Sequence, residues 1–312
     1  MHVAVYGAGA LGLVYGVRLA CRTHASVTFV VRAERLPSAS ARALEPLVIE
    51  RVKETRDRRD ELAAPSFASE IPGDADVVLL AVGTEDLEGI RPVLEGSSAP
   101  IVVLTPMLLA DYTRMRSAFG ERVLAGMPGV VSYAREDHVV RYWLPPAPTR
   151  IDEPRAGAHG DAIRALAVLL AEAGLRTHLE LGVHESNPAT TVCMIPIGMS
   201  VSLAGGLEAL AADADLLSLT SRACREGVEL GRSLGRPEAG AMLGPLLATP
   251  LAMRAVVATL RRLSPEALFY VDEHFGRKLR AQHGVMAREM AALARAKHVP
   301  HDAIDELAMK LV

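Results

Sequence analysis

Apolar runs alternate with amphipathic segments along the first 181 residues. The runs are typical of buried parallel strands and lie at 2–6, 26–31, 76–82 and 101–105. Candidate helices separate them, at about 10–22, 85–94 and 108–118. A helix over 162–173, capped at Gly160-Asp161 and ended by Gly174, and a strand over 176–181 complete this half. This alternation predicts an α/β fold with a Rossmann-type doubly wound sheet.

The pattern changes near residue 182. From there to the end it shows helical periods, as in Leu219, Ala223, Leu230 and Leu234, which lie near one helix face before Gly235. No later stretch has the pattern of a strand. We therefore expect two domains: the Rossmann-type domain over residues 1–181 and an all-helical domain over residues 182–312.

Two segments interrupt the alternation in the first half. The sequence RVKETRDRRD at 51–60 mixes both charges without apolar periodicity, which favours a solvated loop or helix face over a phosphate-binding patch. The proline-rich sequence RYWLPPAPTRIDE at 141–153 suggests an irregular strand pair that closes the sheet edge.

One uncharged stretch, 186–207, has the length of a membrane span. It contains Pro188 and Pro196 together with several Gly, Ser and Thr residues, and it lacks basic or aromatic flanks. These features favour a buried core helix or a homodimer interface over a membrane span.

Composition narrows the class of protein. Half of the residues are hydrophobic and the formal net charge is -3, so nothing favours nucleic-acid binding. The three cysteines are far apart and form no Cys-x-x-Cys pair, which favours a reduced, cytoplasmic setting. His298 and His301 are better explained as a helix start than as a metal site, so no metal is expected.

A glycine-rich turn carries the clearest chemical signal. The sequence Gly7-Ala8-Gly9-Ala10-Leu11-Gly12 follows a strand and opens a helix, which is the context that the dinucleotide fingerprint requires. Gly7 would make the tight turn, Gly9 would admit the pyrophosphate, and Gly12 would let helix and strand pack closely. We count Ala10 and Leu11 with this site, because the helix N-terminus offers its N–H groups to the phosphates.

The end of the second strand indicates which dinucleotide binds. An acidic residue there would accept a hydrogen bond from the 2′-hydroxyl of NAD, but this chain has Arg32, with Arg35 nearby. A guanidinium matches a 2′-phosphate, so NADP is favoured over NAD. The other explanation is a surface arginine at a strand end.

The GAGALG turn, Arg32 and the helical second half together resemble the ketopantoate reductase family. The resemblance implies an enzyme that reduces 2-dehydropantoate to pantoate with NADPH on the pantothenate pathway. It also implies a cofactor domain over 1–181, a substrate and dimerisation domain over 182–312, and an active site between them. Val82 and Gly83, after the strand at 76–82, join the expected cofactor-binding residues.

The family's catalytic positions are not reproduced. Gly83 stands where the family has a lysine, and Pro106 falls where it has an asparagine. A second, catalytic lysine is expected near HESNPATTVCMIPIG, yet no lysine occurs between Lys53 and Lys278. The family's glutamate falls near Arg280.

Reduction of a carbonyl still needs a proton donor for the developing alkoxide. His184 could donate the proton, Glu185 could orient it and Asn187 could hold a carbonyl. The other explanation is an Asn-Pro helix start with solvated flanks. Lys278, in FYVDEHFGRKLRAQHG with Tyr270, Asp272, His274, Arg280 and His283, is a further candidate, against an exposed charged helix face.

The sequence thus predicts an NADPH-dependent reductase that acts on a small carbonyl substrate, either 2-dehydropantoate or a different one. The alternative is a non-catalytic NADP-binding sensor or scaffold that has lost the family's lysine.

Overall fold

The computed structural model describes residues 1–42, 44–52, 59–83, 87–105, 107–135, 137–235 and 249–311. The chain divides into two compact units. The first comprises Met1–Pro106 and Ala110–His184, and the second comprises Met107–Leu109 and Glu185–Val312.

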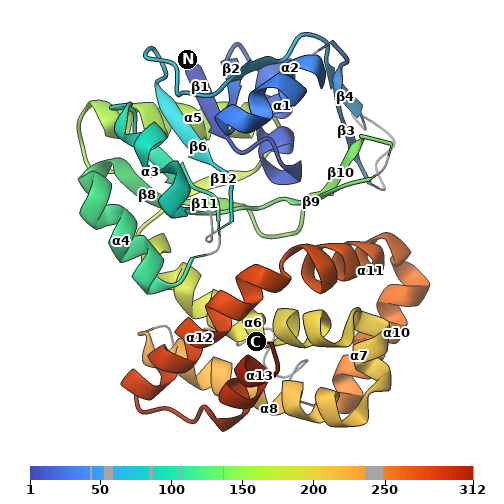
Figure 1. The fold of residues 1–312 in the computed structure, drawn as a ribbon. Coiled ribbons are helices and arrows are strands. Elements are labelled where there is room, and N and C mark those ends of the chain that lie inside the picture. Colours follow the sequence, from blue (N-terminus) through green and yellow to red (C-terminus); the bar gives the residue numbers. More distant parts are fainter. Residues whose placement is uncertain are drawn as a thin grey trace. The chain divides into compact units, whose positions relative to one another are not determined.

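An eight-stranded sheet organises the first unit (Figure 1). Its order is β12-β11-β8-β7-β6-β1-β2-β5. The strands are β1 (His2–Tyr6), β2 (Ser26–Val30), β5 (Ser66–Ala68), β6 (Val77–Leu80), β7 (Ile101–Val103), β8 (Val123–Met127), β11 (Thr149–Asp152) and β12 (Thr177–Glu180). Neighbours pair parallel except β11 and β8, which are antiparallel. This arrangement confirms the expected Rossmann-type sheet.

The helices of this unit connect the strands. They are α1 (Ala10–Arg22), α2 (Leu36–Arg42), α3 (Leu87–Glu95), α4 (Leu109–Phe119) and α5 (Ala158–Glu172), with short 3-10 turns η1 (Ala33–Arg35) and η3 (Gly120–Arg122). The cap expected at Gly160-Asp161 is wrong, because α5 begins earlier, after Gly157. Gly157 has φ +120°, a conformation that favours glycine and allows the chain to enter the helix there. Gly174, with φ +78°, follows the helix end as expected.

A second, four-stranded sheet was not expected from the sequence. Its order is β4-β3-β10-β9, formed by β3 (Leu47–Arg51), β4 (Arg59–Leu62), β9 (Val131–Ala134) and β10 (Val140–Trp143). The predicted strand pair over 141–153 is wrong, because β10 belongs to this sheet and β11 to the other.

The charged segment 51–60 is also less solvated than predicted. Asp60, on β4, is buried between Arg18 and Arg22 of α1, with N–O distances of 2.8 and 2.5 Å. Residues 53–58 of that segment lie outside the described residues.

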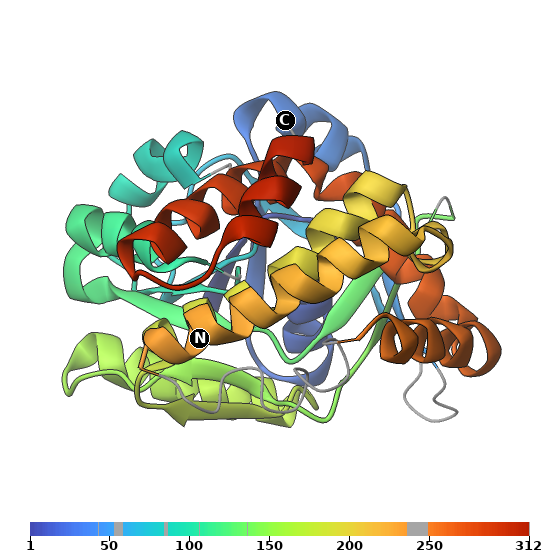
Figure 2. The ribbon, with the colours of Figure 1, turned by 90° about the horizontal axis from the view of Figure 1, so that it is seen from below.

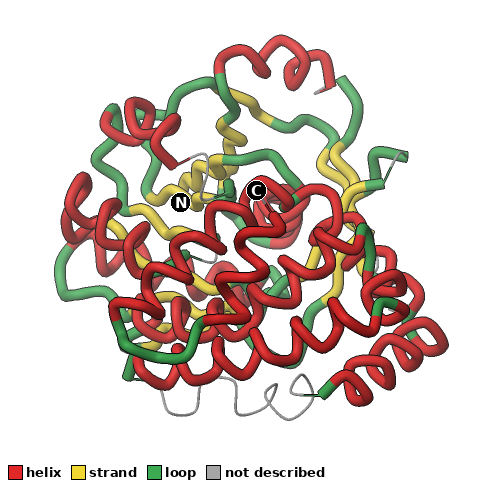
Figure 3. The backbone as a smooth tube through the Cα atoms, turned by 60° about the horizontal axis from the view of Figure 1, so that its bottom comes forward, coloured by secondary structure: helices red, strands yellow, loops and turns green. Residues whose placement is uncertain are grey.

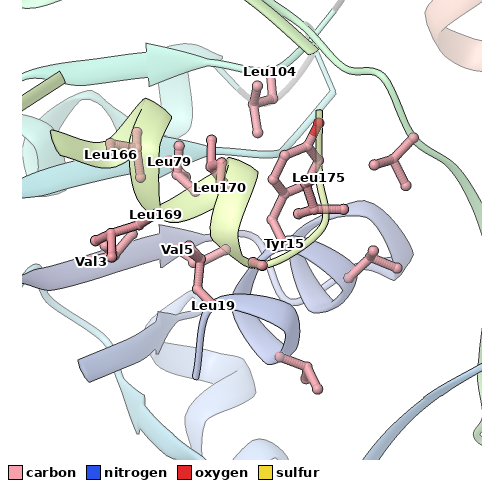
Figure 4. Packing of buried hydrophobic residues seen from close by; sticks show 14 of the residues in the cluster. Val3, Val5, Tyr15, Leu19, Leu79, Leu104, Leu166, Leu169, Leu170 and Leu175 are labelled. Atoms are coloured by element: carbon pink, nitrogen blue, oxygen red, sulfur yellow. The ribbon is translucent and has the colours of Figure 1, made fainter. Parts of the chain in front are cut away.

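The core of the first unit forms around α1, which contacts strands of both sheets. Tyr15 and Leu19 of α1 lie in one cluster with Val5 of β1 and Leu166 and Leu170 of α5 (Figure 4). The Tyr15 hydroxyl lies 2.5 Å from Thr149 Oγ1. These side chains are fully buried, so truncating a leucine among them would cost roughly 2–5 kcal/mol.

The second unit contains only helices and loops among its described residues, as Figure 3 shows, which confirms the expected helical region. Its elements are α6 (Val183–Ala204), α7 (Leu207–Ala212), α8 (Ala214–Ser233), α10 (Pro250–Leu263), α11 (Pro265–Val271), the π-helix η4 (Asp272–Lys278), α12 (Arg280–Ala296) and α13 (Asp302–Leu311). Helix α13 packs against both α8 and α12 (Figure 2).

The long uncharged segment forms most of α6. Val192, Met199 and Val201 are fully buried within the second unit, so this segment is a core helix. Of the helices that the structure describes, none combines the length and apolar character needed to cross a membrane.

Candidate functional site

The glycine turn links β1 to α1, and two of its glycines are required by the fold itself. Gly7 has φ +104°, and a Cβ there would lie 2.5 Å from the carbonyl oxygen of Ala81. A Cβ on Gly12 would lie 2.0 Å from the carbonyl oxygen of Gly7. Neither distance is tolerable, so larger residues would force the turn away from β6 or the helix away from the turn.

Gly9 differs from both. Its φ of -79° suits any residue, and a Cβ there would meet no atom of the part of the chain that the structure describes within 4 Å. Gly9 is also the N-cap of α1, with no side-chain cap, and no acidic residue stands in the first turn. The open space therefore borders a helix N-terminus, where Ala10 and Leu11 begin the helix, and this arrangement fits a phosphate group.

The other expected cofactor residues follow neighbouring strands. Because β1 lies between β6 and β2, Val82 and Gly83 come after the strand on one side of the turn and Arg32 after the strand on the other. Arg32 is exposed and precedes η1. The Thr105 hydroxyl, after β7, donates to the carbonyl oxygen of Val82. The structure thus gathers these residues at the carboxyl ends of β2, β1 and β6.

His184 has a carboxylate partner that sequence reasoning missed. Its Nδ1 lies 2.9 Å from Oδ2 and 3.1 Å from Oδ1 of Asp152, the last residue of β11. Asp152 Oδ1 also accepts from the backbone N–H groups of Val183 (2.7 Å) and His184 (3.3 Å). The carboxylate therefore caps α6 and binds the imidazole at once. The Asp152 side chain is 10% exposed and that of His184 is 37% exposed.

Tyr112 covers one face of this imidazole. The rings stack with centroids 5.2 Å apart and an angle of 19° between their planes. Burial, followed by the nearby Asp152 charge, raises the pKa of Tyr112 to about 12. The Arg116 guanidinium lies 6.0 Å from the Tyr112 ring centroid and pairs with Glu121 at 2.5 Å.

These side chains line a cavity of about 660 Å³ within the first unit. Its wall also includes Arg155, His159, Leu124 and Leu181. A cavity of this size admits a small organic molecule. Asp152 lies 32 residues before His184, in a segment that carries no catalytic motif, so no local sequence signal could have paired them.

Among the described residues, the lining of this cavity includes His184 but not Glu185 or Asn187. Glu185 and Asn187 follow His184 on α6, and both belong to the second unit, where Glu185 is exposed and Asn187 buried. Lys278 ends the π-helix η4, and its side chain lies outside the described part of the structure. Pro106, which takes the place of the family's asparagine, also lies outside the described residues.

The wider cluster around Lys278 is more buried than an exposed charged face would be. His283, on α12, is 4% exposed, and its Nδ1 lies 2.7 Å from Ser202 Oγ. The Phe275 ring stacks on it with centroids 5.9 Å apart. Burial lowers the pKa of His283 to about 4. The Arg280 guanidinium donates to the carbonyl oxygen of Ser202 at 2.7 Å.

No metal centre is evident in the described ranges, because no three His, Cys, Asp or Glu side chains there are grouped to hold an ion. The three cysteines are free thiols.

Comparison with known proteins connects this geometry to a family. The sequence model described as "Ketopantoate reductase PanE/ApbA" matches residues 3–152. Among curated proteins, no sequence matches this chain.

Solved structures share the whole fold at low identity. A PanE/ApbA family ketopantoate reductase from Ralstonia eutropha JMP134 has 19% identity and a TM-score of 0.73, over 100% of this chain and 97% of that one. D-mandelate dehydrogenase, solved with NADH and anilino(oxo)acetate, has 14% identity and a TM-score of 0.72, over 100% and 97%. A dimeric ketopantoate reductase from Staphylococcus aureus has 14% identity and a TM-score of 0.65, over 100% and 97%.

Proposed function

We propose that the chain belongs to the ketopantoate reductase PanE/ApbA family, whose model matches residues 3–152, and that it is an NADPH-dependent reductase. Its substrate is a 2-keto acid, either 2-dehydropantoate or a related carbonyl compound. The reaction converts the keto group to a hydroxyl group.

The open space at Gly9 is the observation that carries this proposal. No atom of the described residues fills the position of a Cβ there, while Gly7 and Gly12 have steric reasons to be glycine. A glycine that the fold does not need, at the uncapped start of a helix, is explained by a ligand phosphate. Gly7, Gly9, Ala10, Leu11 and Gly12 would hold the pyrophosphate.

Arg32 supports NADP as the dinucleotide. It is exposed after β2, at the place where the adenosine ribose is recognised in this kind of sheet. Its guanidinium would pair with a 2′-phosphate. D-mandelate dehydrogenase shares the fold and holds NADH, so the choice between the two forms depends on this position. Val82 and Gly83 would border the cofactor after β6.

The bound cofactor supplies the hydride, and the protein must supply the proton. His184, Glu185, Asn187 and Lys278 are the candidates for that role and for holding the carbonyl. His184 has the strongest support, because it lines a cavity and has a buried carboxylate as its partner.

We also propose the roles of the two domains, the oligomeric state and the cellular compartment. Residues 1–181 act as the cofactor-binding domain, and residues 182–312 as the substrate and dimerisation domain. The dimeric Staphylococcus aureus relative supports a homodimer, and three free thiols fit a cytoplasmic setting.

A second candidate function is a non-catalytic NADP sensor or scaffold. The observation that favours it is the absence of any lysine between Lys53 and Lys278, where the resembling family places a catalytic one. Such a protein would bind NADPH without turnover.

Thermal unfolding with NADPH and with NADH tests the cofactor assignment. We expect NADPH to raise the melting temperature more than NADH at equal concentration, because binding to the folded state stabilises it by mass action. Equal shifts would contradict the role of Arg32, and no shift with either would contradict dinucleotide binding. Subsequent turnover of a 2-keto acid would exclude the sensor.

A further inference from the structure

The Asp152–His184 pair is arranged as a proton-donating dyad. In such a pair, a buried carboxylate fixes which imidazole nitrogen carries the proton, and the other nitrogen exchanges a proton with the substrate. Asp152 provides the fixed acceptor, since its two oxygens lie 2.9 and 3.1 Å from His184 Nδ1. The half-exposed imidazole borders the cavity.

We propose that Asp152 is a positioning residue that holds His184 with Nδ1–H bonded to the carboxylate, so that Nε2 delivers the proton to the substrate alkoxide. This inference rests on the proposed reductase function and assigns a dyad in place of the missing lysine. As hydride adds to the carbonyl carbon, the carbonyl π electrons move to oxygen. The donor is the imidazolium form of His184, which carries a proton on each nitrogen. Its Nε2–H bond breaks, an O–H bond forms on the substrate, and the neutral imidazole that remains keeps Nδ1–H. Solvent then returns a proton to Nε2.

The location of the dyad agrees with this role. Along the sheet, Arg32 follows β2, the glycine turn follows β1 and Val82 follows β6. A dinucleotide with its 2′-phosphate at Arg32 would extend in the direction of β7. Tyr112 stands in the first turn of α4, a few residues after β7, and stacks on His184. Tyr112 thus links His184 to the segment that follows β7, the strand next to β6 in the sheet.

The hydrogen bonds of Asp152 provide a sharp test. Oδ1 accepts two backbone N–H groups as well as contacting the imidazole, so the asparagine of an Asp152→Asn variant would keep its oxygen there and cap α6 equally well. Its NH₂ group would then replace Oδ2 and donate toward Nδ1. Asp152→Asn is thus expected to preserve the fold and to reverse the tautomer, leaving Nε2–H and an accepting Nδ1.

The first readout is independent of activity. Two-bond ¹H–¹⁵N correlation spectra of the full chain, labelled with ¹⁵N-histidine and recorded where the imidazole is neutral, report each tautomer. His184→Gln assigns the signal. We expect Nδ1–H in the wild type and Nε2–H in Asp152→Asn, while Asp137→Asn changes nothing. Asp137 is the matched control, because it also accepts a backbone N–H, at 3.1 Å from Val139, and pairs with a cation.

The second readout is steady-state turnover of 2-dehydropantoate. We expect Asp152→Asn and His184→Gln each to lower kcat on the order of 100-fold, with KM changed less than about threefold. Asp152→Glu should recover part of kcat, since it restores the carboxylate.

The outcomes separate the two proposals. An Nε2–H tautomer in the wild type, or Asp152→Asn with unchanged kcat, would overturn the dyad while leaving the reductase in place. Absence of turnover of any 2-keto acid by the wild type would overturn the reductase function and, with it, the catalytic use of the dyad. The predicted tautomer together with parallel losses of kcat would support both.

Discussion

The glycine turn and the Asp152–His184 pair are held by different forces. Steric contact fixes the turn: Gly7 and Gly12 lie so close to neighbouring backbone that no other side chain fits. Hydrogen bonds and ring stacking fix the pair, through β11, α4 and α6. Substitutions at Gly7 or Gly12 should therefore disrupt the fold, whereas a substitution in the Asp152–His184 pair can remove its chemistry and leave the fold intact.

Replacing Gly12 should have the largest effect. Gly12→Ala would place a Cβ 2.0 Å from the Gly7 carbonyl oxygen, and we expect unfolding free energy to fall by at least about 3 kcal/mol. Chemical denaturation followed by the fluorescence of Trp143, the single tryptophan, measures this in the first unit. Gly89→Ala is the control, since a Cβ there meets nothing. Equal stabilities of the two variants would show that the turn is not sterically fixed.

His283 provides a contrast with His184, because its partner is the neutral Ser202 hydroxyl instead of a carboxylate. Burial lowers its pKa to about 4, below the ordinary value of about 6.5. The unfolded chain therefore binds the proton more readily, and stability present above about pH 6.5 is lost as pH falls toward 4. The difference in unfolding free energy between the wild type and His283→Gln should shrink by roughly 3 kcal/mol over that pH range.

Denaturation followed by far-ultraviolet circular dichroism at several pH values measures this helical unit. Identical pH dependence in the wild type and the variant would show that His283 does not titrate in this way.

Gly9 should separate binding from folding within the turn. Gly9→Ala puts a methyl group into open space, so we expect stability to change by less than about 1 kcal/mol. NADPH affinity should fall about 30-fold, or about 2 kcal/mol, because the methyl group blocks close approach of the pyrophosphate. Calorimetric titration provides the affinity. Unaltered binding would remove the main support for the cofactor site.

Arg32 should show the smallest effect. Arg32→Ala is expected to weaken NADPH binding by about tenfold, the loss of one charge-assisted contact. NADH affinity serves as the internal control and should stay constant. A parallel loss for both dinucleotides would mean that Arg32 does not recognise a 2′-phosphate.

Local patterns in the sequence predicted the parts of the fold that depend on neighbouring residues. The main sheet, the glycine turn and the helical second half follow from short-range periodicity. The second sheet did not, because β10 pairs with β3, which lies far earlier in the chain, and pairing partners at such separation leave no local pattern. Asp60 was interpreted as solvated because the cations that bury it come from α1.

Among the residues of the candidate site, too, the sequence reveals those that are close together in the chain more readily than those that only the fold brings together. Gly7, Gly9 and Gly12 form one motif, so the sequence reveals them together. His184 could be named from its neighbours, but Asp152 and Tyr112 reach it only through the fold. Glu185 and Asn187 lie on α6 with His184, and their part in the site stays a prediction.

The most direct test of the account is stoichiometric conversion of 2-dehydropantoate. The purified full chain would be incubated with NADPH and this acid, and NADP and pantoate would be quantified together. We predict equal amounts of both products, formed at an ordinary enzymatic rate on the order of 1–1,000 per second. Tight NADPH binding with no pantoate would contradict 2-dehydropantoate as the substrate, and no turnover of any 2-keto acid would contradict the reductase itself.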